Sequence, residues 1–515
     1  MKKTFFLSII TASMIFVSSC NKDLNQAPIS LGTTDNFYQS ASDFIQGING
    51  VYNDLRNYPD RLLFLSEIRS DNIYGVSSLG VRDWDPINNF QRAIAGNTYV
   101  EEAWAANFNG ILRANTLLGK ITTNGANIGS ASLATRLQGE ARYLRAFYYF
   151  DLVKYFGKVP VIDHPVLSDE ANTIGRSPVA DVYKFIIADL QFAIANLPGS
   201  YTGVDVGRVT KYAAEATLAQ VYMARSGVTY GIDGPGLGLN EWGLALPLIN
   251  DIITNGGFVF NPSYASIFSY TNQSPTTNKE AVFDVMYQTG LSGTAAVYGA
   301  DFVWQLAPNQ WFKAVKNDSK SNGSLEIIPT SNDLTNSYAT ADVRKAFNIN
   351  LTPYTDVSGT EARPFFKKYI DLTKLPSSSR FDWGINFIAI RYTDILMMKA
   401  ECILRGATGG GTQTDVDAIV NQIRTRANAA AVPLLNVTLA QLFDERRKEF
   451  ADEGSRWFDL QRSGNLIAIM NAWITAEDGT AKKQMNQVIP GYVIYPVPQS
   501  QLDAAPGLYT QNTGY

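Results

Sequence analysis

Residues 139–160 read GEARYLRAFYYFDLVKYFGKVP. Apolar side chains recur in this stretch at the spacing of one helix face: Leu144, Phe147, Tyr148, Leu152 and Tyr155. Gly157 and Pro160 then end the periodic run, because glycine and proline interrupt a helix. The stretch therefore predicts a long helix over 139–157 that buries one face against neighbouring helices.

Five further stretches have helical periodicity: 178–197, 210–226, 241–254, 388–404 and 415–431. The first helix of each expected pair is rich in small residues, such as Ala213, Ala214, Ala216 and Ala219. Small residues let neighbouring helices approach closely, so the helices are expected to pack in pairs. Paired helices of this kind indicate a degenerate tetratricopeptide-like solenoid. A plain helical bundle gives the same periodicity, so the repeats alone leave both architectures open.

The composition changes over residues 256–385, which are rich in Asn, Ser, Thr, Gly and aromatic residues. Helical periodicity is weak here, and the alternation over 282–287 predicts one strand. Most of this part is expected to be loop packed on a helical scaffold formed by about 41–255 and 386–431. Long ordered loops usually carry function, so the ligand site is expected in this loop-rich part.

The N-terminus has the features of a lipoprotein leader. Lys2 and Lys3 precede an apolar run over 5–17 that is short for a membrane-spanning helix. Val17-Ser18-Ser19-Cys20 resembles the lipobox of bacterial lipoproteins. Residues 1–19 are then a signal peptide, Cys20 carries the lipid, and 20–40 form a tether. An ordinary secretory signal with an accidental cysteine is the alternative.

Bulk composition excludes several classes of function. The net charge is -4 with no basic block, which argues against nucleic acid as a partner. The single histidine, His164, excludes His-rich zinc sites and leaves no separate Ser-His-Asp triad. Cys402 lies in an apolar run and is expected to be a buried small hydrophobe. No ligand spacing points to a metal, and no cofactor is predicted.

Four stretches resemble the RagB/SusD family of surface lipoproteins. The first is 139–160, and the others read GRVTKYAA at 207–214, IRYTDIL at 390–396 and ERRKEFADEGSRWFDL at 445–460. YPVP at 495–498 and the closing QNTGY at 511–515 fit as well, although Thr513 stands where the family usually has proline. The matches run in order along the chain, so the resemblance covers its whole length.

The resemblance implies a mostly α fold, with degenerate tetratricopeptide helix pairs and a loop-rich insertion in one domain over 41–515. It also implies a lipid-anchored position on the outer face of the outer membrane. Such proteins pair with a SusC-like TonB-dependent transporter and deliver oligosaccharide to it without catalysis.

The motif at 445–460 could be mistaken for a catalytic site. Glu445, Glu449 and Glu453 share one helical stripe with interleaved arginines. A glycosidase instead holds two carboxylates across its substrate at a set separation. Arginine partners keep carboxylates ionised, so the stripe is interpreted as ion pairs that fix helix packing. Trp457 and Trp104 are expected in the core.

Sugar binding needs aromatic rings on loops, with polar groups beside them to bond the hydroxyls. Trp84 is the first candidate, because Arg82 and Asp83 precede it and the family often places a sugar-stacking aromatic in this region. Further candidates lie in one segment of the loop-rich part: Tyr298, Trp304 and Trp311. Each ring could instead pack inward as a loop anchor, because large aromatics are more often buried than exposed.

Two other functions remain open from the sequence. A surface glycoside hydrolase would need a carboxylate pair in the loop-rich part. A peptide-capturing lipoprotein is the other, because tetratricopeptide grooves bind peptides. The leading hypothesis is a surface lipoprotein that binds oligosaccharides for a transporter.

Overall fold

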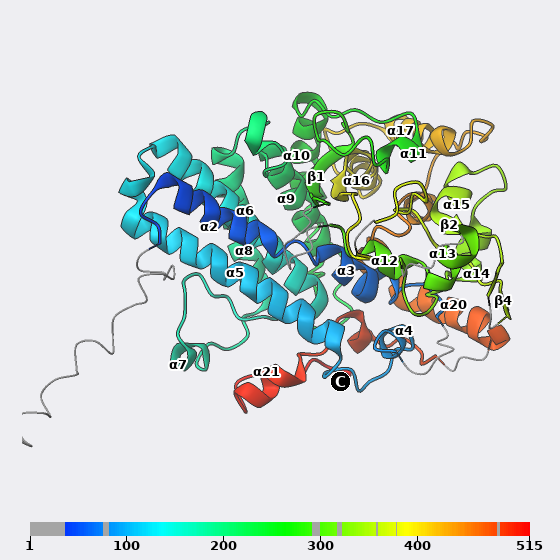
Figure 1. Cartoon of the computed structure of the whole chain (residues 1–515), viewed down its shortest axis with the longest axis horizontal. Coiled ribbons are helices and arrows are strands. Elements are labelled where there is room, and N and C mark those ends of the chain that lie inside the picture. Colours follow the sequence, from blue (N-terminus) through cyan, green and yellow to red (C-terminus); the bar gives the residue numbers. More distant parts are fainter. Residues whose placement is uncertain are drawn as a thin grey trace, which may run out of the picture.

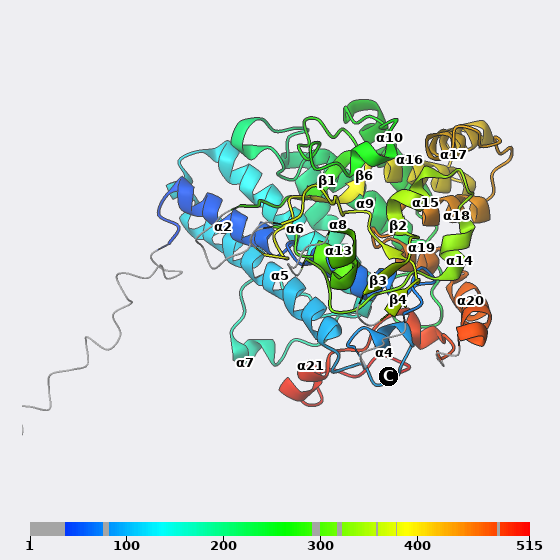
Figure 2. The same ribbon diagram turned by 45° about the vertical axis from the view of Figure 1, so that its right-hand side comes forward.

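The computed structural model describes residues 37–75, 82–290, 299–316, 322–356, 359–376, 379–481 and 485–515. It is mostly helical, as predicted. The long helices of the scaffold are α2 (Ala41–Asn53), α5 (Thr98–Asn124), α6 (Ala131–Phe156), α8 (Val179–Asn196), α9 (Lys211–Arg225), α10 (Trp242–Asn255), α16 (Tyr392–Leu404) and α17 (Gln413–Ala427). Figures 1 and 2 show α2, α5, α6 and α8 on one side of the molecule and the loop-rich part on the other.

Helix α6 is the centre of the scaffold. The side chain of Ser130 accepts a hydrogen bond from the backbone N–H of Leu133 and caps the helix, so α6 begins eight residues before the predicted start at Gly139. Gly157 has φ 68° and ends the helix where predicted. From Tyr143 to Phe156 nearly every side chain is buried, so this half of α6 is surrounded by protein rather than buried on one face.

The helices pack on one another in the order α5, α6, α8, α9, α10, α16 and α17, which confirms the predicted pairing. The four alanines predicted for close approach in α9 are fully buried. Gly110 of α5 lies against the ring of Tyr148 in α6 and leaves no room for a Cβ there. Small residues therefore set the short distances between these helices.

Shorter elements connect the first scaffold helices: α3 (Tyr58–Leu62), the π-helical turn η1 (Leu63–Glu67), α4 (Asp85–Asn88), η2 (Gly125–Ile128), α7 (Ser168–Ala171) and η3 (Gly203–Asp205). The loop-rich part contains α11 (Tyr264–Ile267), β1 (Ala281–Val285), α12 (Val303–Leu306), α13 (Asn309–Lys316), α14 (Asn332–Ser337), α15 (Val343–Asn348), β2 (Ile349–Asn350), β3 (Tyr354–Asp356), β4 (Gly359–Glu361), β5 (Phe365–Phe366) and β6 (Phe387–Arg391).

The predicted strand over 282–287 is β1, and it pairs antiparallel with β6, Val285 lying opposite Phe387. The prediction of helix from residue 388 was wrong at its start, since β6 occupies 387–391 and α16 begins at Tyr392. The sequence FIAIR is aromatic and β-branched, and pairing with β1 satisfies its backbone. Two further pairs, β2 with β5 and β3 with β4, complete the sheets of the described chain.

The C-terminal part of the chain packs against η1 and the residues that follow it. It comprises α18 (Leu439–Glu449), α19 (Arg456–Ser463), α20 (Leu466–Ala481), η4 (Pro490–Val493) and α21 (Gln499–Ala504). Arg69 donates hydrogen bonds to the hydroxyl of Tyr515, 2.8 Å away, and to the carbonyl of Tyr492. The hydroxyl of Tyr495 donates to the carbonyl of Leu65. The last residues of the chain are thereby fixed to η1 and its neighbours.

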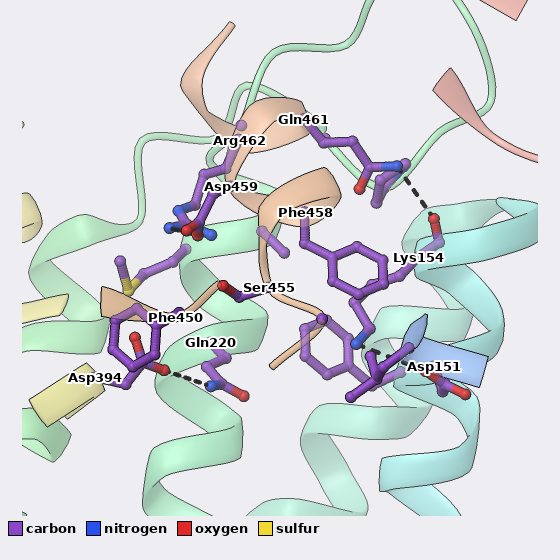
Figure 3. Close-up of a pocket in the computed structure, with 18 of the residues that line it drawn as sticks. Asp151, Lys154, Gln220, Asp394, Phe450, Ser455, Phe458, Asp459, Gln461 and Arg462 are labelled. Atoms are coloured by element: carbon purple, nitrogen blue, oxygen red, sulfur yellow. Dashed lines mark hydrogen bonds and ion pairs between the residues drawn. The ribbon is translucent and has the colours of Figure 1, made fainter. Parts of the chain in front are cut away.

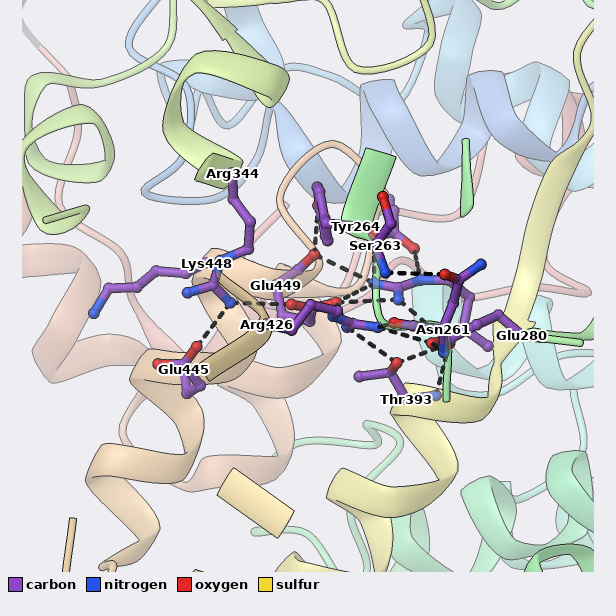
Figure 4. Close-up of polar contacts among 12 residues, drawn as sticks. Asn261, Ser263, Tyr264, Glu280, Arg344, Thr393, Arg426, Glu445, Lys448 and Glu449 are labelled. Atoms are coloured by element: carbon purple, nitrogen blue, oxygen red, sulfur yellow. Dashed lines mark hydrogen bonds and ion pairs between the residues drawn. The ribbon is translucent and has the colours of Figure 1, made fainter. Parts of the chain in front are cut away.

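A buried ion network centres on Glu449 of α18 (Figure 4). Its carboxylate lies 2.6 Å from Arg426, 3.1 Å from Arg391 and 3.0 Å from Arg344. Arg344 also contacts Glu445, and Arg391 also contacts Glu453. The prediction that the motif carboxylates are structural ion pairs is therefore confirmed. Burial alone would raise the pKa of Glu449, but Arg426, Arg391 and Arg344 lower it to about 2.

We expect Glu449→Gln to destabilise the protein by about 3–5 kcal/mol at pH 7, because it leaves buried guanidiniums without their carboxylate. The lowered pKa also means that Glu449 stabilises the fold above its ordinary value of 4.5, and that this contribution is lost as pH falls towards about 2. Urea unfolding at neutral and acidic pH measures both effects.

The matched control is Asp444→Asn on the same helix, which breaks the exposed pair between Asp444 and Lys448. Its cost should stay below about 1 kcal/mol, because solvent screens exposed pairs. Equal losses for the two variants would contradict a special role for the network.

Candidate functional site

The structure places two of the predicted sugar-stacking tryptophans in the core. Trp84 is 5% exposed, and its indole lies against the backbone of Gly75. Trp311 is 4% exposed and packs on Phe312 and Phe365. Neither ring presents a free face in this conformation, so both have the packing of loop anchors. A ligand contact by either residue stays a prediction that this packing does not favour.

Arg82 and Asp83 lie beside Trp84 at the surface. The guanidinium of Arg82 contacts the Glu326 carboxylate at 2.8 Å, which joins this segment to the loop-rich part. Asp83 is exposed and accepts a hydrogen bond from the hydroxyl of Thr98. Two other predicted residues, Cys20 and Tyr298, lie outside the described residues.

Trp304 on α12 is the predicted tryptophan that remains partly exposed. The guanidinium carbon of Arg380 lies 4.4 Å from its ring centroid, a cation–π contact. Phe381 meets the ring edge-on at a centroid distance of 5.4 Å. These contacts hold the indole in place.

Polar side chains from α3 and its flanks surround α12, which lies next to α3 in Figure 1. Arg56 forms a half-exposed ion pair with Asp301 at 3.3 Å. Asp60 of α3 lies near Asp301 and Gln305. We call this set the Trp304 surface; its members are Arg56, Asp60, Asp301, Trp304, Gln305 and Arg380.

Two carboxyl groups of the Trp304 surface affect one another. Burial raises the pKa of Asp60 to about 8, and the nearby Asp301 carboxylate adds to this effect while Gln305 and Arg61 oppose it. Burial also raises the pKa of Asp301, although Arg56 opposes the rise. Asp60 therefore keeps its proton at neutral pH and can donate as well as accept a hydrogen bond.

Sequence reasoning missed Arg56, Asp60, Asp301 and Arg380. Asp301 could have been found from the sequence, because it stands three residues before Trp304 in the same loop segment. Asp60 lies in α3 and Arg56 in the turn before it, more than 200 residues earlier in the chain. No local pattern points from them to α12, because only the tertiary fold brings the two segments together.

Several other predicted residues lie where expected. Trp457 and Trp104 are in the core, and Cys402 is buried. His164 is exposed and contacts Asp163 and Glu170. Within the described ranges, no cluster of three or more His, Cys, Asp or Glu side chains could hold a metal. In the same ranges, no helix has the length and apolar character needed to cross a bilayer.

Two family models match separate parts of the chain. The model of the SusD family matches residues 339–515. A second model, described as starch-binding and associating with the outer membrane, matches residues 33–223. SusD-like protein P25 of Formosa agariphila is 24% identical, over 96% of this chain and 97% of that protein.

Solved structures share the fold over most of the chain. Surface glycan-binding protein A from Bacteroides fluxus has a TM-score of 0.75 and 21% identity, covering 92% of this chain and 99% of that one. Surface glycan-binding protein A from Bacteroides thetaiotaomicron, in complex with laminarihexaose, has a TM-score of 0.74, the same identity and the same coverage.

We expect Asp60→Asn to remove part of the pH dependence of stability. Because the folded pKa of about 8 exceeds the ordinary value of 3.8, the native state holds a proton that the unfolded chain releases. Stability should therefore fall as pH rises from about 4 to about 8, and the asparagine variant should lose about 1–2 kcal/mol less over that range.

Urea unfolding at several pH values measures this difference. Asp503→Asn, at an exposed aspartate of α21, is the control and should follow the wild type. Parallel pH curves for wild type and Asp60→Asn would show that Asp60 does not carry the buried proton.

Proposed function

The chain belongs to the SusD family, and we propose that it captures oligosaccharides at the cell surface through the Trp304 surface. The observation that carries the proposal is a partly exposed indole fixed among carboxyl, amide and guanidinium groups. A pyranose ring offers a flat C–H patch to an aromatic ring and a rim of hydroxyls to polar groups. A relative of the same fold is known in complex with laminarihexaose, which supports this class of ligand.

The charges of the Trp304 surface favour a neutral glycan. Two of its polar groups, the protonated Asp60 and the amide of Gln305, are neutral, and the Asp301 carboxylate is paired with the Arg56 guanidinium. Neutral donors and acceptors suit the hydroxyls of a neutral glycan, whereas a uronic acid polymer would bring its carboxylates beside that of Asp301.

Binding is proposed to be non-enzymatic. The motif carboxylates Glu445, Glu449 and Glu453 are each less than 10% exposed and are engaged by arginines, so they cannot reach a glycosidic bond. At the Trp304 surface, the Asp60–Asp301 pair is the one arrangement that favours a hydrolase as second candidate. Product analysis in the binding experiment separates the two functions.

We expect the protein without its leader to bind laminarihexaose in isothermal titration calorimetry, and Trp304→Ala to weaken binding by about 10-fold or more. The loss follows from removal of the stacking ring. Chromatography of the same mixture should show intact hexasaccharide, and an oligouronate of equal length should bind more weakly.

Tyr201→Ala is the matched control, because Tyr201 is also partly exposed and has the Arg136 guanidinium over its ring. Its affinity should equal that of the wild type. Unchanged affinity in Trp304→Ala would remove Trp304 from the site. Shorter products would favour the hydrolase, and displacement of the glycan by peptides would favour the peptide-capturing alternative.

The proposal extends to the anchor and the partner. Cys20 carries the lipid, residues 20–40 form the tether, and 41–515 act as one domain on the outer face of the outer membrane. A SusC-like TonB-dependent transporter is the partner that receives the glycan. A family model described as associating with the outer membrane supports this location.

We expect Cys20→Ala to abolish incorporation of labelled palmitate and to move the protein out of the outer-membrane fraction. Each buried methylene adds roughly 0.8 kcal/mol to anchoring, so loss of the acyl chains releases the chain. Affinity capture of the anchored form in mild detergent should also recover a TonB-dependent transporter.

Cys402→Ala is the control, since Cys402 is the one other cysteine of the sequence and is buried. It should keep both the label and the membrane location. Retention of the label in Cys20→Ala would place the lipid elsewhere.

A further inference from the structure

A cavity lies in the loop-rich part, between α11, α13, α15 and the segment that follows β5. Figure 1 shows these three helices in the loop-rich part. The volume of the cavity is about 340 Å3, and aromatic side chains line it, including Phe268, Tyr270, Trp311 and Phe347. Tyr270 and Phe347 are partly exposed, so the cavity can be reached from solvent. This size and lining are typical of small-molecule sites, and no residue of the Trp304 surface lines the cavity.

Two opposite charges border this cavity from one short segment. The backbone N–H of Ile370 donates to the carbonyl of Lys367 at 2.9 Å, which closes a β-turn over 367–370. A β-turn keeps its first and last Cα atoms within about 7 Å of one another. Asp371 follows the turn directly, and both Lys367 and Asp371 line the cavity. The turn therefore keeps a cation and an anion within the span of one small ligand.

Neither of these two charges has an ionic partner. Within the described residues, the ammonium of Lys367 forms no ion pair or hydrogen bond, and burial lowers the pKa of Lys367 with no carboxylate to oppose the effect. Asp371 Oδ1 accepts hydrogen bonds from the backbone N–H and the hydroxyl of Thr373, at 2.8 and 2.7 Å. In the same ranges, no cation pairs with the Asp371 carboxylate. A partly buried charge without a counter-ion favours a ligand that supplies one.

The third charged residue of the lining, Lys368, is fully engaged elsewhere. Its buried ammonium donates to the Glu453 carboxylate and, at 2.8 Å, to the carbonyl of Ala451. The lining thus offers one uncompensated positive charge, at Lys367, and one uncompensated negative charge, at Asp371. A ligand that matches this cavity carries one charge of each sign.

A smaller cavity inside the scaffold, between α6, α9, β6 and α19, lacks this feature (Figure 3). Charged groups of its lining are paired with one another: Lys154 with Asp151, and both Arg446 and Arg462 with Asp459. Its volume of about 130 Å3 is also below that of an engineered cavity in another protein, of about 150 Å3, which holds benzene alone. Both size and unpaired charge therefore point to the cavity of the loop-rich part.

We propose that the cavity between α11, α13 and α15 binds a free aromatic amino acid in its zwitterionic form. The carboxylate of the ligand contacts the Lys367 ammonium, and the ammonium of the ligand contacts the Asp371 carboxylate. Each charge thereby gains the partner that the protein does not supply, in a charge-assisted hydrogen bond. The ring packs among the aromatic side chains. The volume is about twice that of the cavity that holds benzene, which leaves room for the amino-acid backbone.

The test is calorimetry of the leaderless protein with phenylalanine and two analogues that each keep one charge. Hydrocinnamate lacks the amine, and phenethylamine lacks the carboxylate. Phenylalanine should bind at millimolar or better affinity, and each analogue at least about 10-fold more weakly. Lys367→Met should weaken phenylalanine and leave phenethylamine unchanged. Asp371→Asn should weaken phenylalanine and leave hydrocinnamate unchanged, because each variant removes the partner of one ligand charge.

Lys374→Met is the matched control, since Lys374 is an exposed lysine of the same segment that does not line the cavity. It should bind phenylalanine as the wild type does, and Lys367→Met should still bind laminarihexaose normally. Wild-type affinity for phenylalanine no higher than for either analogue, or no phenylalanine binding up to about 10 mM, would overturn the proposal whether or not a variant folds.

Discussion

The carboxylate of Glu449 holds together segments that are far apart in the sequence. Three guanidiniums contact it: Arg391 at the end of β6, Arg426 in α17 and Arg344 in α15. Arg426 also reaches Glu280, which precedes β1. Charges buried this deeply are tolerated only when every one has a partner, so the network requires these elements to adopt one mutual arrangement. The packing of the loop-rich part on the helical scaffold depends on that requirement.

A chain of contacts links this network to the Trp304 surface. Arg391 closes β6, and Asn386 at the other end of β6 accepts a hydrogen bond from the backbone N–H of Tyr287. The hydroxyl of Tyr287 donates to the carbonyl of Arg56, whose guanidinium holds Asp301. Trp304 follows Asp301 by less than one helical turn. A binding site made of short elements is thereby kept in position by groups from the rigid part of the molecule.

The sequence predicted the parts of the fold that rest on local patterns. Helical periodicity located α8, α9, α10 and α17 because each buries a stripe against its neighbours, and it located α6 although the second half of that helix is buried on every side. It failed at residues 387–391, where pairing with β1 overrides the continuation of a helix. Arginines alternating with Glu445, Glu449 and Glu453 were enough to predict that these carboxylates are ion-paired. The sequence did not identify the partners, because Arg344, Arg391 and Arg426 come from other segments.

The candidate site was less predictable for a physical reason. A tryptophan in a polar loop can stack on a ligand or anchor the loop, and the two roles need the same residue type. Trp84 fills the space above Gly75 and is an anchor in this structure, whereas Trp304 keeps part of its ring open. Whether such a ring is buried or open depends on the residues that the tertiary fold places against it. Asp60 could not be predicted at all, because the effect of Asp301 on its pKa arises only from tertiary proximity.

Buried charge has opposite consequences in different parts of this molecule. Around Glu449 every ion has partners of opposite sign, and the result is stability. At Asp60 compensation is incomplete, and Asp60 responds by keeping its proton. Such a group would gain more from a ligand than a fully paired group would, because it can share its proton with a hydroxyl. Incomplete compensation therefore distinguishes the Trp304 surface from the ionic scaffold.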